Sequence, residues 1–355
     1  MDKEKIITEA VELLCRLIAT PRVSRDETAA SDIMEQWMRE RRLSPLRSGN
    51  NLLLVCPDYR PDRETVMLNA HIDTVRPVAS WTRAPHSPDI EGDKLYGIGS
   101  NDCGGGLVTL LQVYRILAER ERGYNLVYLA SCEEEVSGVN GIRRVIPELQ
   151  SVAPGIKVDV AIVGEPTGMQ PAIAEKGLMV IDMTARGISG HAARNEGVNA
   201  IYEALDDMLW IRSHKFGKVS ELLGPTLMSL TVVNAGTQHN VVPDECRMVI
   251  DVRSNEHYTN EEIFDEIGKN VRSEIKARSF HLHSSHISPE HPLIKKCVSM
   301  GMKPFGSPTL SDQALMPWQS FKLGPGDSAR SHSADEYIRI SELHNALDTY
   351  LELLG

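Results

Sequence analysis

The sequence has no excess of positive charge, no paired cysteines and no long hydrophobic run. Its 38 Lys and Arg face 49 Asp and Glu, so the average surface would not attract nucleic acid or anionic membranes. The six cysteines lack Cys-x-x-Cys spacing, which favours reduced thiols over disulfides or a structural zinc site. The polar start lacks the apolar core of a signal peptide, and no run approaches membrane-spanning length. We therefore expect a cytoplasmic protein that binds a small molecule.

Alternating helical and strand patterns predict an α/β fold for much of the chain. At 355 residues the chain exceeds the usual size of a single core, so two packed units are expected. Ser24 and Glu27 form a capping-box signature before a predicted helix that continues through Trp37 and Met38. Other helices are expected at 6–18 and 107–117, and strands at 51–55, 65–70, 125–130 and 159–163. This alternation is typical of a mixed, largely parallel sheet with helices on both faces.

A different order follows in the middle of the chain. The patterns predict strands and helices in the ferredoxin-like order β-α-β-β-α-β, at 178–185, 197–211, 226–233, 245–252, 259–276 and 280–287. A helix near 293–300, a strand near Phe321 and a capped helix at 341–354 are expected to complete the first domain. We therefore predict a catalytic domain formed by 1–175 and 288–355, interrupted by an inserted domain at 176–287.

Five separated segments carry residues that commonly bind metals. They are His71-Ile72-Asp73, Asn101-Asp102, Glu133-Glu134-Glu135, Gly164-Glu165-Pro166 and Ser331-His332. Together they offer two imidazoles and several carboxylates, which is the ligand set of a two-metal hydrolytic site. Several of them follow predicted strands, and open α/β sheets bind ligands beyond the carboxyl ends of their strands. One site could therefore use every segment.

Each segment alone also has a structural explanation. His71 is compatible with a satisfied structural histidine, Asp102 with a helix N-cap, and His332 with a surface histidine. The triplet at 133–135 is harder to explain, because adjacent carboxylates repel and this run directly follows an apolar strand. A bound dication would relieve that repulsion, and one glutamate could bind metal while its neighbour takes a proton from water. Since these separate structural explanations would all have to hold together, we favour a shared metal site.

These residues resemble the dinuclear zinc aminoacylase and carboxypeptidase family, which includes acetylornithine deacetylase and succinyl-diaminopimelate desuccinylase. The matching stretches run in the family's order through both predicted domains. They are HID at 71–73, GSNDCGGG at 99–106, CEEEVSG at 132–138, VGEPTG at 163–168, RGISGHAA at 186–193, HNVVPDECRMVIDVR at 239–253 and LGPGDSARSHSADEYI at 323–338. The compact length and the last stretch look most like acetylornithine deacetylase.

The resemblance implies a role for each matching residue. His71, Asp102 and Glu165 would bind one metal ion, and Asp102 would bridge to a second ion held also by Glu135 and His332. The remaining assignments are Glu134 as general base, Asp73 as the outer partner of His71, His191 as the group that stabilises the oxyanion across a dimer, and Asn240 and Arg253 near the substrate. The resemblance also implies a cis peptide bond between Asp102 and Cys103. The family usually has Asp where this chain has Glu133, which leaves the register of Glu134 and Glu135 open.

The implied activity is hydrolysis of the amide bond of an N-acyl amino acid, with N-acetylornithine or N-succinylornithine as the expected substrate in arginine biosynthesis. The expected cofactors are two divalent ions, zinc or else cobalt, in a homodimer that pairs through the inserted lid domain. Arg194, Arg330 or Lys176 could bind a distal carboxylate of a succinyl group. The alternatives are a dipeptidase or aminopeptidase, a succinyl-diaminopimelate desuccinylase, and a metal-bound binding protein without catalysis. Glu134 counts against the last, because metal binding alone needs no base.

Overall fold

Residues 2–194 and 196–355 are described by a computed structural model, and they form two units. The first unit comprises Met1–Ile173, Ile287–Phe305 and Ser311–Gly355, and the second comprises Ala174–His286 and Gly306–Leu310. These breaks lie within two residues of the boundaries drawn from the sequence at 175/176 and 287/288. The short segment Gly306–Leu310 groups with the second unit, although the sequence placed it in the catalytic domain.

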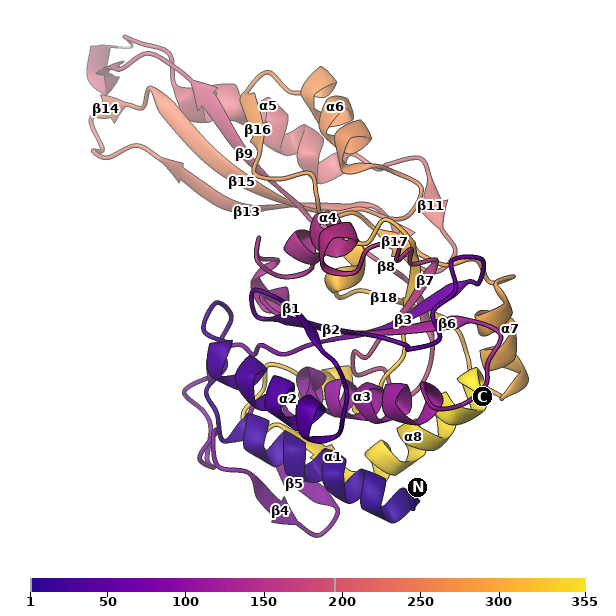
Figure 1. Ribbon diagram of the computed structural model, residues 1–355. Helices are drawn as coiled ribbons and strands as arrows, with labels where there is room; N and C mark the ends of the chain where they lie inside the picture. The colour runs from indigo at the N-terminus through magenta and orange to yellow at the C-terminus, as the bar shows by residue number, and fades with distance from the viewer. Residues whose placement is uncertain (1, 195) are drawn as a thin grey trace. The chain divides into compact units, whose positions relative to one another are not determined.

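A nine-stranded mixed sheet has most of its strands in the first unit (Figure 1). Its central strands β6, β3, β7 and β19 pair in parallel, whereas β1, β2 and β8 add antiparallel partners on the two sides. The bounds are β1 Leu46–Ser48, β2 Asn51–Val55, β3 Thr65–His71, β6 Asn125–Ser131, β7 Val160–Val163, β8 Ala172–Glu175, β17 Ser285–His286, β18 Phe305–Ser307 and β19 Gln319–Lys322. Both β3 and β6 are buried along their whole length, as expected for strands covered on two faces.

Helices cover both faces of this sheet (Figure 1). Side chains alternate along β6, so Leu126 and Tyr128 belong to the core that includes α1, α2, α3 and α8, whereas Val127 and Leu129 belong to the core that includes α4. The helices are α1 Lys3–Ile18, α2 Thr28–Glu40, α3 Gly105–Leu117, α4 Ile142–Val152, α7 Pro292–Ser299 and α8 Ile340–Leu354, and a small sheet joins β4 Asp89–Glu91, β5 Lys94–Tyr96 and β20 Tyr337–Arg339. The predicted mixed α/β architecture is confirmed.

The predicted capping box before α2 is wrong. Glu27 is the N-cap of this helix but makes no side-chain capping bond. The Ser24 hydroxyl instead donates to Asp73 at 2.7 Å. The buried Glu27 carboxylate accepts from the backbone N–H groups of Arg25 and Glu133 at 2.7 and 3.2 Å. Both side chains therefore hold loops at the edge of the sheet, a function that a local capping signature does not reveal.

The second unit has the β-α-β-β-α-β order of the sequence analysis. Its sheet has the order β13-β15-β9-β16 and every pair is antiparallel. The elements are β9 Met179–Arg186, α5 Ala200–Ser213, β13 Leu227–Ala235, β15 Glu245–Arg253, α6 Asn260–Asn270 and β16 Glu274–Ala277, with short pairs β10 Gly190–His191 with β14 Val241–Val242 and β11 Val219–Ser220 with β12 Gly224–Pro225. In the part of the chain that the structure describes, every helix is too short or too polar to span a lipid bilayer.

The last helix and strand of this unit differ from the sequence prediction. The helix expected at 259–276 ends at Asn270, and the final strand is Glu274–Ala277 instead of 280–287. The cause is Asp207, a buried residue of α5 whose carboxylate accepts from the backbone N–H groups of Arg272 and Ser273 at 3.0 and 2.9 Å. These bonds hold the chain extended directly after the helix, so the strand begins earlier than its apolar pattern indicated.

Thr259→Ala should lower the free energy of unfolding by about 0.5–2 kcal/mol, because it removes a working capping box. The Thr259 hydroxyl accepts from Glu262 N–H at 3.1 Å, and Glu262 accepts from Thr259 N–H at 3.0 Å. Urea unfolding measures the loss. Thr8→Ala is the matched control, because the exposed Thr8 hydroxyl donates to the Glu4 carbonyl oxygen within its own helix α1. Its loss should change stability by less than about 0.5 kcal/mol. Equal losses in the two variants would contradict the capping argument.

Candidate metal centre

Three neighbouring parallel strands bring polar residues to one edge of the sheet. His71 ends β3, Glu134 and Glu135 follow β6, and Glu165 follows β7. Because parallel strands place their carboxyl ends at the same edge, these side chains meet there. Asp102 lies in the turn Ser100–Gly104 before α3. His332 lies just after the short helical turn Ser328–Arg330.

Asp102 lies between the two histidines. Its Oδ1 is 3.2 Å from His71 Nε2, and its Oδ2 is 3.5 Å from His332 Nε2. Glu135 Oε2 is 2.9 Å from His332 Nε2, and Glu165 Oε1 is 3.7 Å from His71 Nε2. The structure therefore brings all five residues that the sequence marked as metal ligands into one cluster of the first unit. Asp102 occupies the position between the histidines that a bridging carboxylate would need.

The donor set fits a pair of divalent ions. Ligand atoms of His71, Asp102 and Glu135 all lie within 4.8 Å of one another. Glu165 Oε1 is buried and has no hydrogen-bond partner among the described residues. Burial, followed by the charge of Asp102, raises the pKa of Glu165 to about 8, so gathering these carboxylates without a cation is unfavourable. Imidazole nitrogens with carboxylate oxygens are ligands that zinc and related ions accept.

The His71 ring is oriented by its neighbour Asp73. His71 Nδ1 lies 2.9 Å from the backbone carbonyl oxygen of Asp73 and 3.5 Å from the carboxylate. Since a carbonyl oxygen can only accept, Nδ1 carries a proton, so Nε2 is the nitrogen that would offer its lone pair to a bound metal ion. The backbone oxygen, rather than the expected carboxylate, is thus the nearer partner. The carboxylate accepts from the N–H groups of Glu134 and Glu135 at 3.1 and 3.2 Å.

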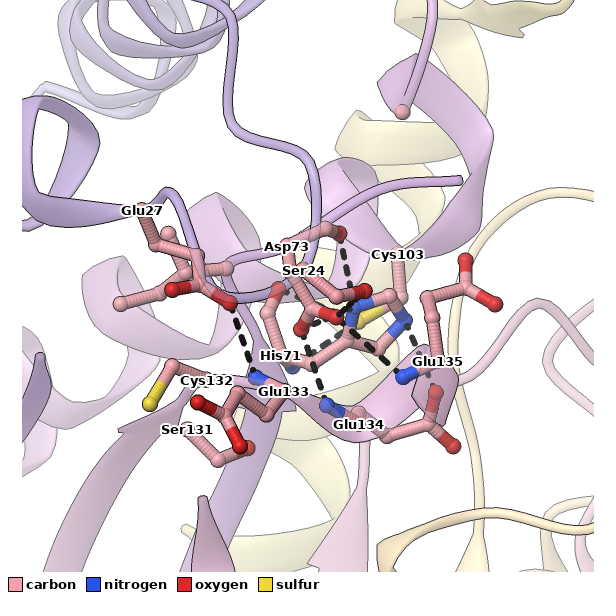
Figure 2. A network of polar contacts seen from close by, with 12 residues as sticks. Ser24, Glu27, His71, Asp73, Cys103, Ser131, Cys132, Glu133, Glu134 and Glu135 are labelled. Atoms are coloured by element: carbon pink, nitrogen blue, oxygen red, sulfur yellow. Dashed lines mark hydrogen bonds and ion pairs between the residues drawn. The ribbon is translucent and has the colours of Figure 1, made fainter. Parts of the chain in front are cut away.

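These two bonds define the register of the glutamate triplet. In Figure 2 the side chains of Glu134 and Glu135 extend toward the side of the His71 ring, whereas Glu133 lies on the other side. Glu133 has a left-handed φ of 55°, and its carboxylate accepts from the Asn140 side chain and N–H at 2.7 and 3.2 Å. Glu134 Oε2 is 4.0 Å from His71 Nε2. The middle glutamate is therefore beside the cluster, and the last one is in it.

Three buried residues that the sequence analysis did not assign surround the cluster. Arg22 donates to the carbonyl oxygens of Ile72 and Gly99, and Glu336 accepts from backbone N–H groups of the turn that carries Asp102. Asp312 accepts from the Ser131 hydroxyl at 2.5 Å, at the end of β6. Only Glu336 had a signal, since it lies in the quoted stretch at 323–338. The peptide bond between Asp102 and Cys103 is cis, which confirms the expectation.

The other predicted site residues belong to the second unit. His191 is exposed on β10 and its Nδ1 accepts from Ala193 N–H at 3.2 Å, and Asn240 is exposed just before β14. Arg253 ends β15, and Asp251 binds its guanidinium through two bonds of 2.8 and 3.1 Å. Lys176 donates to the Pro225 carbonyl oxygen at 2.7 Å. In the first unit, Arg330 is held by the Glu342 carboxylate at 2.8 and 3.0 Å.

The fold and the cluster define a metal-dependent amidohydrolase of the metallopeptidase type. The chain belongs to Peptidase family M20/M25/M40, whose model matches residues 67–355. The chain is 26% identical over 362 residues to acetylornithine deacetylase of Pectobacterium carotovorum, with 92% of each chain covered. It is 25% identical over 380 residues to succinyl-diaminopimelate desuccinylase 2 of a Ruegeria species, covering 96% of this chain and 93% of the relative.

A solved structure supports the same architecture. The YXEP protein of Bacillus subtilis, described as a dinuclear metal binding peptidase of family M20, has a TM-score of 0.73 at 16% identity. The comparison covers 99% of this chain and 98% of that one. The likeness therefore extends over the whole length of both chains. At this identity it establishes the shared fold.

Proposed function

We propose that the protein hydrolyses the amide bond of an N-acyl amino acid, with N-acetylornithine or N-succinylornithine as substrate, in arginine biosynthesis. The observation that carries the proposal is the position of Glu134, which lies beside the donor cluster at 4.0 Å from His71 Nε2 without being needed as a ligand. A protein that only binds metal gains nothing from a second carboxylate there. The acetylornithine deacetylase among the relatives supports this choice of substrate.

One divalent ion, zinc or cobalt, would be held by His71, Asp102 and Glu165. A second ion would be held by Asp102, Glu135 and His332. When bound, such ions make water acidic and polarise an acyl carbonyl. Glu134 takes the proton of the attacking water on its carboxylate and passes that proton to the departing amine nitrogen. The Asp73 carboxylate accepts from the N–H groups of Glu134 and Glu135. The backbone positions of the base and of the neighbouring ligand are therefore fixed relative to each other. His191 stabilises the oxyanion, and Asn240 and Arg253 bind the substrate.

An assay of the zinc-loaded protein distinguishes the candidate substrates. The panel contains N-acetylornithine, N-succinylornithine, N-acetylcitrulline, succinyl-diaminopimelate and a set of dipeptides. We expect the highest kcat/KM for one of the two N-acylornithines. Preference for a dipeptide, or for succinyl-diaminopimelate, would replace this substrate by another one of the same reaction class. Absence of zinc-dependent turnover on the whole panel would favour a binding protein.

We further propose a homodimer that pairs through the second unit. The exposed side of α5 carries the large apolar side chains Ile201, Tyr202, Leu205 and Leu209, and β13 is an edge strand of its sheet. Tyr202 and Leu209 are 69% and 58% exposed. A contiguous apolar surface of this kind is typical of a protein interface.

We also propose a cytoplasmic location. All six cysteines are free thiols, which agrees with a reducing cytosolic environment.

Leu205→Glu combined with Leu209→Glu should convert the dimer into a monomer, because two buried charges would oppose association. Sedimentation velocity measures the mass in solution. The matched control is Ile90→Glu on β4, a change at a similarly exposed apolar residue of the first unit, which should leave the mass unchanged. A monomeric wild-type protein would refute the dimer, and a dimeric double variant would refute this choice of surface.

If His191 serves the partner's site, two inactive variants should complement each other. Glu134→Ala and His191→Ala homodimers should both be nearly inactive. In a mixed dimer, the subunit that keeps Glu134 receives an intact His191 from its neighbour, so one complete site forms and activity returns. Mixed dimers purified with two different affinity tags exclude failed subunit exchange. Inactive mixed dimers would place His191 in the site of its own subunit.

A further inference from the structure

Glu336 ties together the two loops that carry Asp102 and His332. Its carboxylate accepts three backbone N–H groups, from Gly99 on Oε2 at 3.0 Å and from Asn101 and Asp102 on Oε1 at 2.9 Å each. The residue is only 3% exposed. Two of the donors belong to the turn that presents Asp102, Gly99 immediately precedes that turn, and Glu336 itself lies four residues after His332. One side chain therefore fixes the distance between two loops that are far apart in the sequence.

Asn101 forms a second tie between the same loops. Its side-chain nitrogen donates to the Asp327 carbonyl oxygen at 3.0 Å and to Ser331 Oγ at 3.3 Å, and its side-chain oxygen accepts from Asp327 N–H at 3.0 Å. The Glu336 carbonyl oxygen accepts from Gly97 N–H at 3.0 Å. Beyond this point β20 pairs with β5, which continues the contact as a regular ladder. The two loops are therefore joined along their length and not at a single point.

Arg22 holds the other side of the same turn. It donates to the carbonyl oxygens of Gly99 and Ile72, while Glu336 accepts from the N–H of Gly99. A buried guanidinium and a buried carboxylate thus lie on either side of Gly99, and the positive charge offsets the carboxylate that the fold places near Asp102. Because Ile72 is the neighbour of His71, this arrangement connects the His71 strand with the Asp102 turn.

We propose that Glu336 is a positioning residue of the metal centre, which holds Asp102 and His332 at the separation that metal binding requires before any ion arrives. The inference rests on the dinuclear site proposed above. Asp102 is the residue shared by both ions and His332 is a ligand of one of them, so the loop spacing acts on the affinity of the site. Groups that orient metal ligands by direct hydrogen bonds typically contribute 10- to 100-fold to metal affinity, and Glu336 would act in the same range through the backbone that carries Asp102.

The test is Glu336→Gln, which keeps the size of the side chain but replaces one acceptor oxygen by an N–H₂ donor. At least one of the three N–H groups then faces another donor, so the turn moves away from its position. We expect zinc affinity to fall about 10- to 100-fold, measured by competition with a chromophoric chelator. The absorption bands of the cobalt-loaded protein should also change, because they report the geometry of the ligands. Circular dichroism of the metal-free protein verifies that the variant is folded.

Asp207→Asn is the matched control. Asp207 is also a buried carboxylate that accepts two backbone N–H groups, but it lies in the second unit, where it fixes the start of β16. This change should lower stability and leave zinc affinity unchanged. An equal loss of affinity in both variants would show a general effect of destabilisation and overturn the inference.

The remaining outcomes separate the inference from the proposed function. If wild-type protein binds no zinc, the dinuclear site itself is refuted. If wild-type protein binds zinc and folded Glu336→Gln binds it equally well with the same cobalt spectrum, the positioning role is refuted and the site stands. If Glu336→Gln does not fold, Asn101→Ala takes its place, because it removes the other tie between the same loops. Unchanged zinc affinity in folded Asn101→Ala would then overturn the inference.

Discussion

Glu134→Gln is expected to lower kcat about 100- to 10,000-fold, the usual contribution of a general base, while metal content stays at the wild-type value. The amide has nearly the shape of the carboxylate but cannot take a proton from water. Glu134 lies beside the donor cluster and not between its histidines, so its loss removes no assigned ligand. Steady-state kinetics and atomic emission on the same preparation measure the two quantities.

A different pattern would contradict this role of Glu134. Loss of zinc in Glu134→Gln would identify it as a ligand, and full activity would exclude it as the base. The loop geometry should be preserved, because the Glu134 N–H that bonds Asp73 is a backbone group and survives the substitution. A crystal structure or hydrogen exchange of the variant checks this point.

Glu135→Gln should lose both metal and activity, although the chemical change is the same one residue further along. Glu135 Oε2 is 2.9 Å from His332 Nε2, where an anionic oxygen would complete the ligand set of the second ion. A neutral amide is a much weaker ligand, so zinc content should fall toward one ion per chain. Atomic emission after dialysis measures the stoichiometry.

Glu133→Gln is the matched control within the same triplet. Its carboxylate bonds Asn140 and not the cluster, so the change can disturb the loop but removes neither a ligand nor the base. Zinc content should stay close to wild type, and kcat should fall far less than in Glu134→Gln. If Glu133→Gln lost zinc while Glu135→Gln retained it, the order of roles derived from the structure would be wrong.

Periodicity alone located much of the fold. The runs at 51–55, 65–70 and 125–130 become β2, β3 and β6 with ends shifted by at most one residue, because a strand buried on both faces leaves a continuous apolar run. The order β-α-β-β-α-β was equally visible. The prediction that failed concerned the start of a helix, which was inferred from a short local motif. Ser24 and Glu27 match a capping signature, yet they bond Asp73 and Glu133, which the chain brings near only after folding.

The ligand residues could be recognised because metals select a few side-chain types that stand out at strand ends. Arg22 could not be recognised, since it contacts backbone carbonyl oxygens of Ile72 and Gly99, and any residue supplies a carbonyl oxygen. The register of the triplet also needed the structure. It depends on the left-handed φ of Glu133 and on two N–H bonds to Asp73. No pattern of residues in the sequence predicts either feature.

The tie between the Asp102 and His332 loops joins Asn101 to Ser331, residues 230 positions apart. On the ribosome, His71, Asp102 and Glu165 emerge first, the second unit follows, and His332 appears only near the end of synthesis. Domains fold as units while the chain grows. A nascent chain that stops before His332 therefore has the residues assigned to one ion and lacks a ligand of the other. Because Glu336 also lies beyond this point, a truncated chain would lack both His332 and the carboxylate that holds the Asp102 turn, so only the finished chain could assemble the proposed two-ion centre.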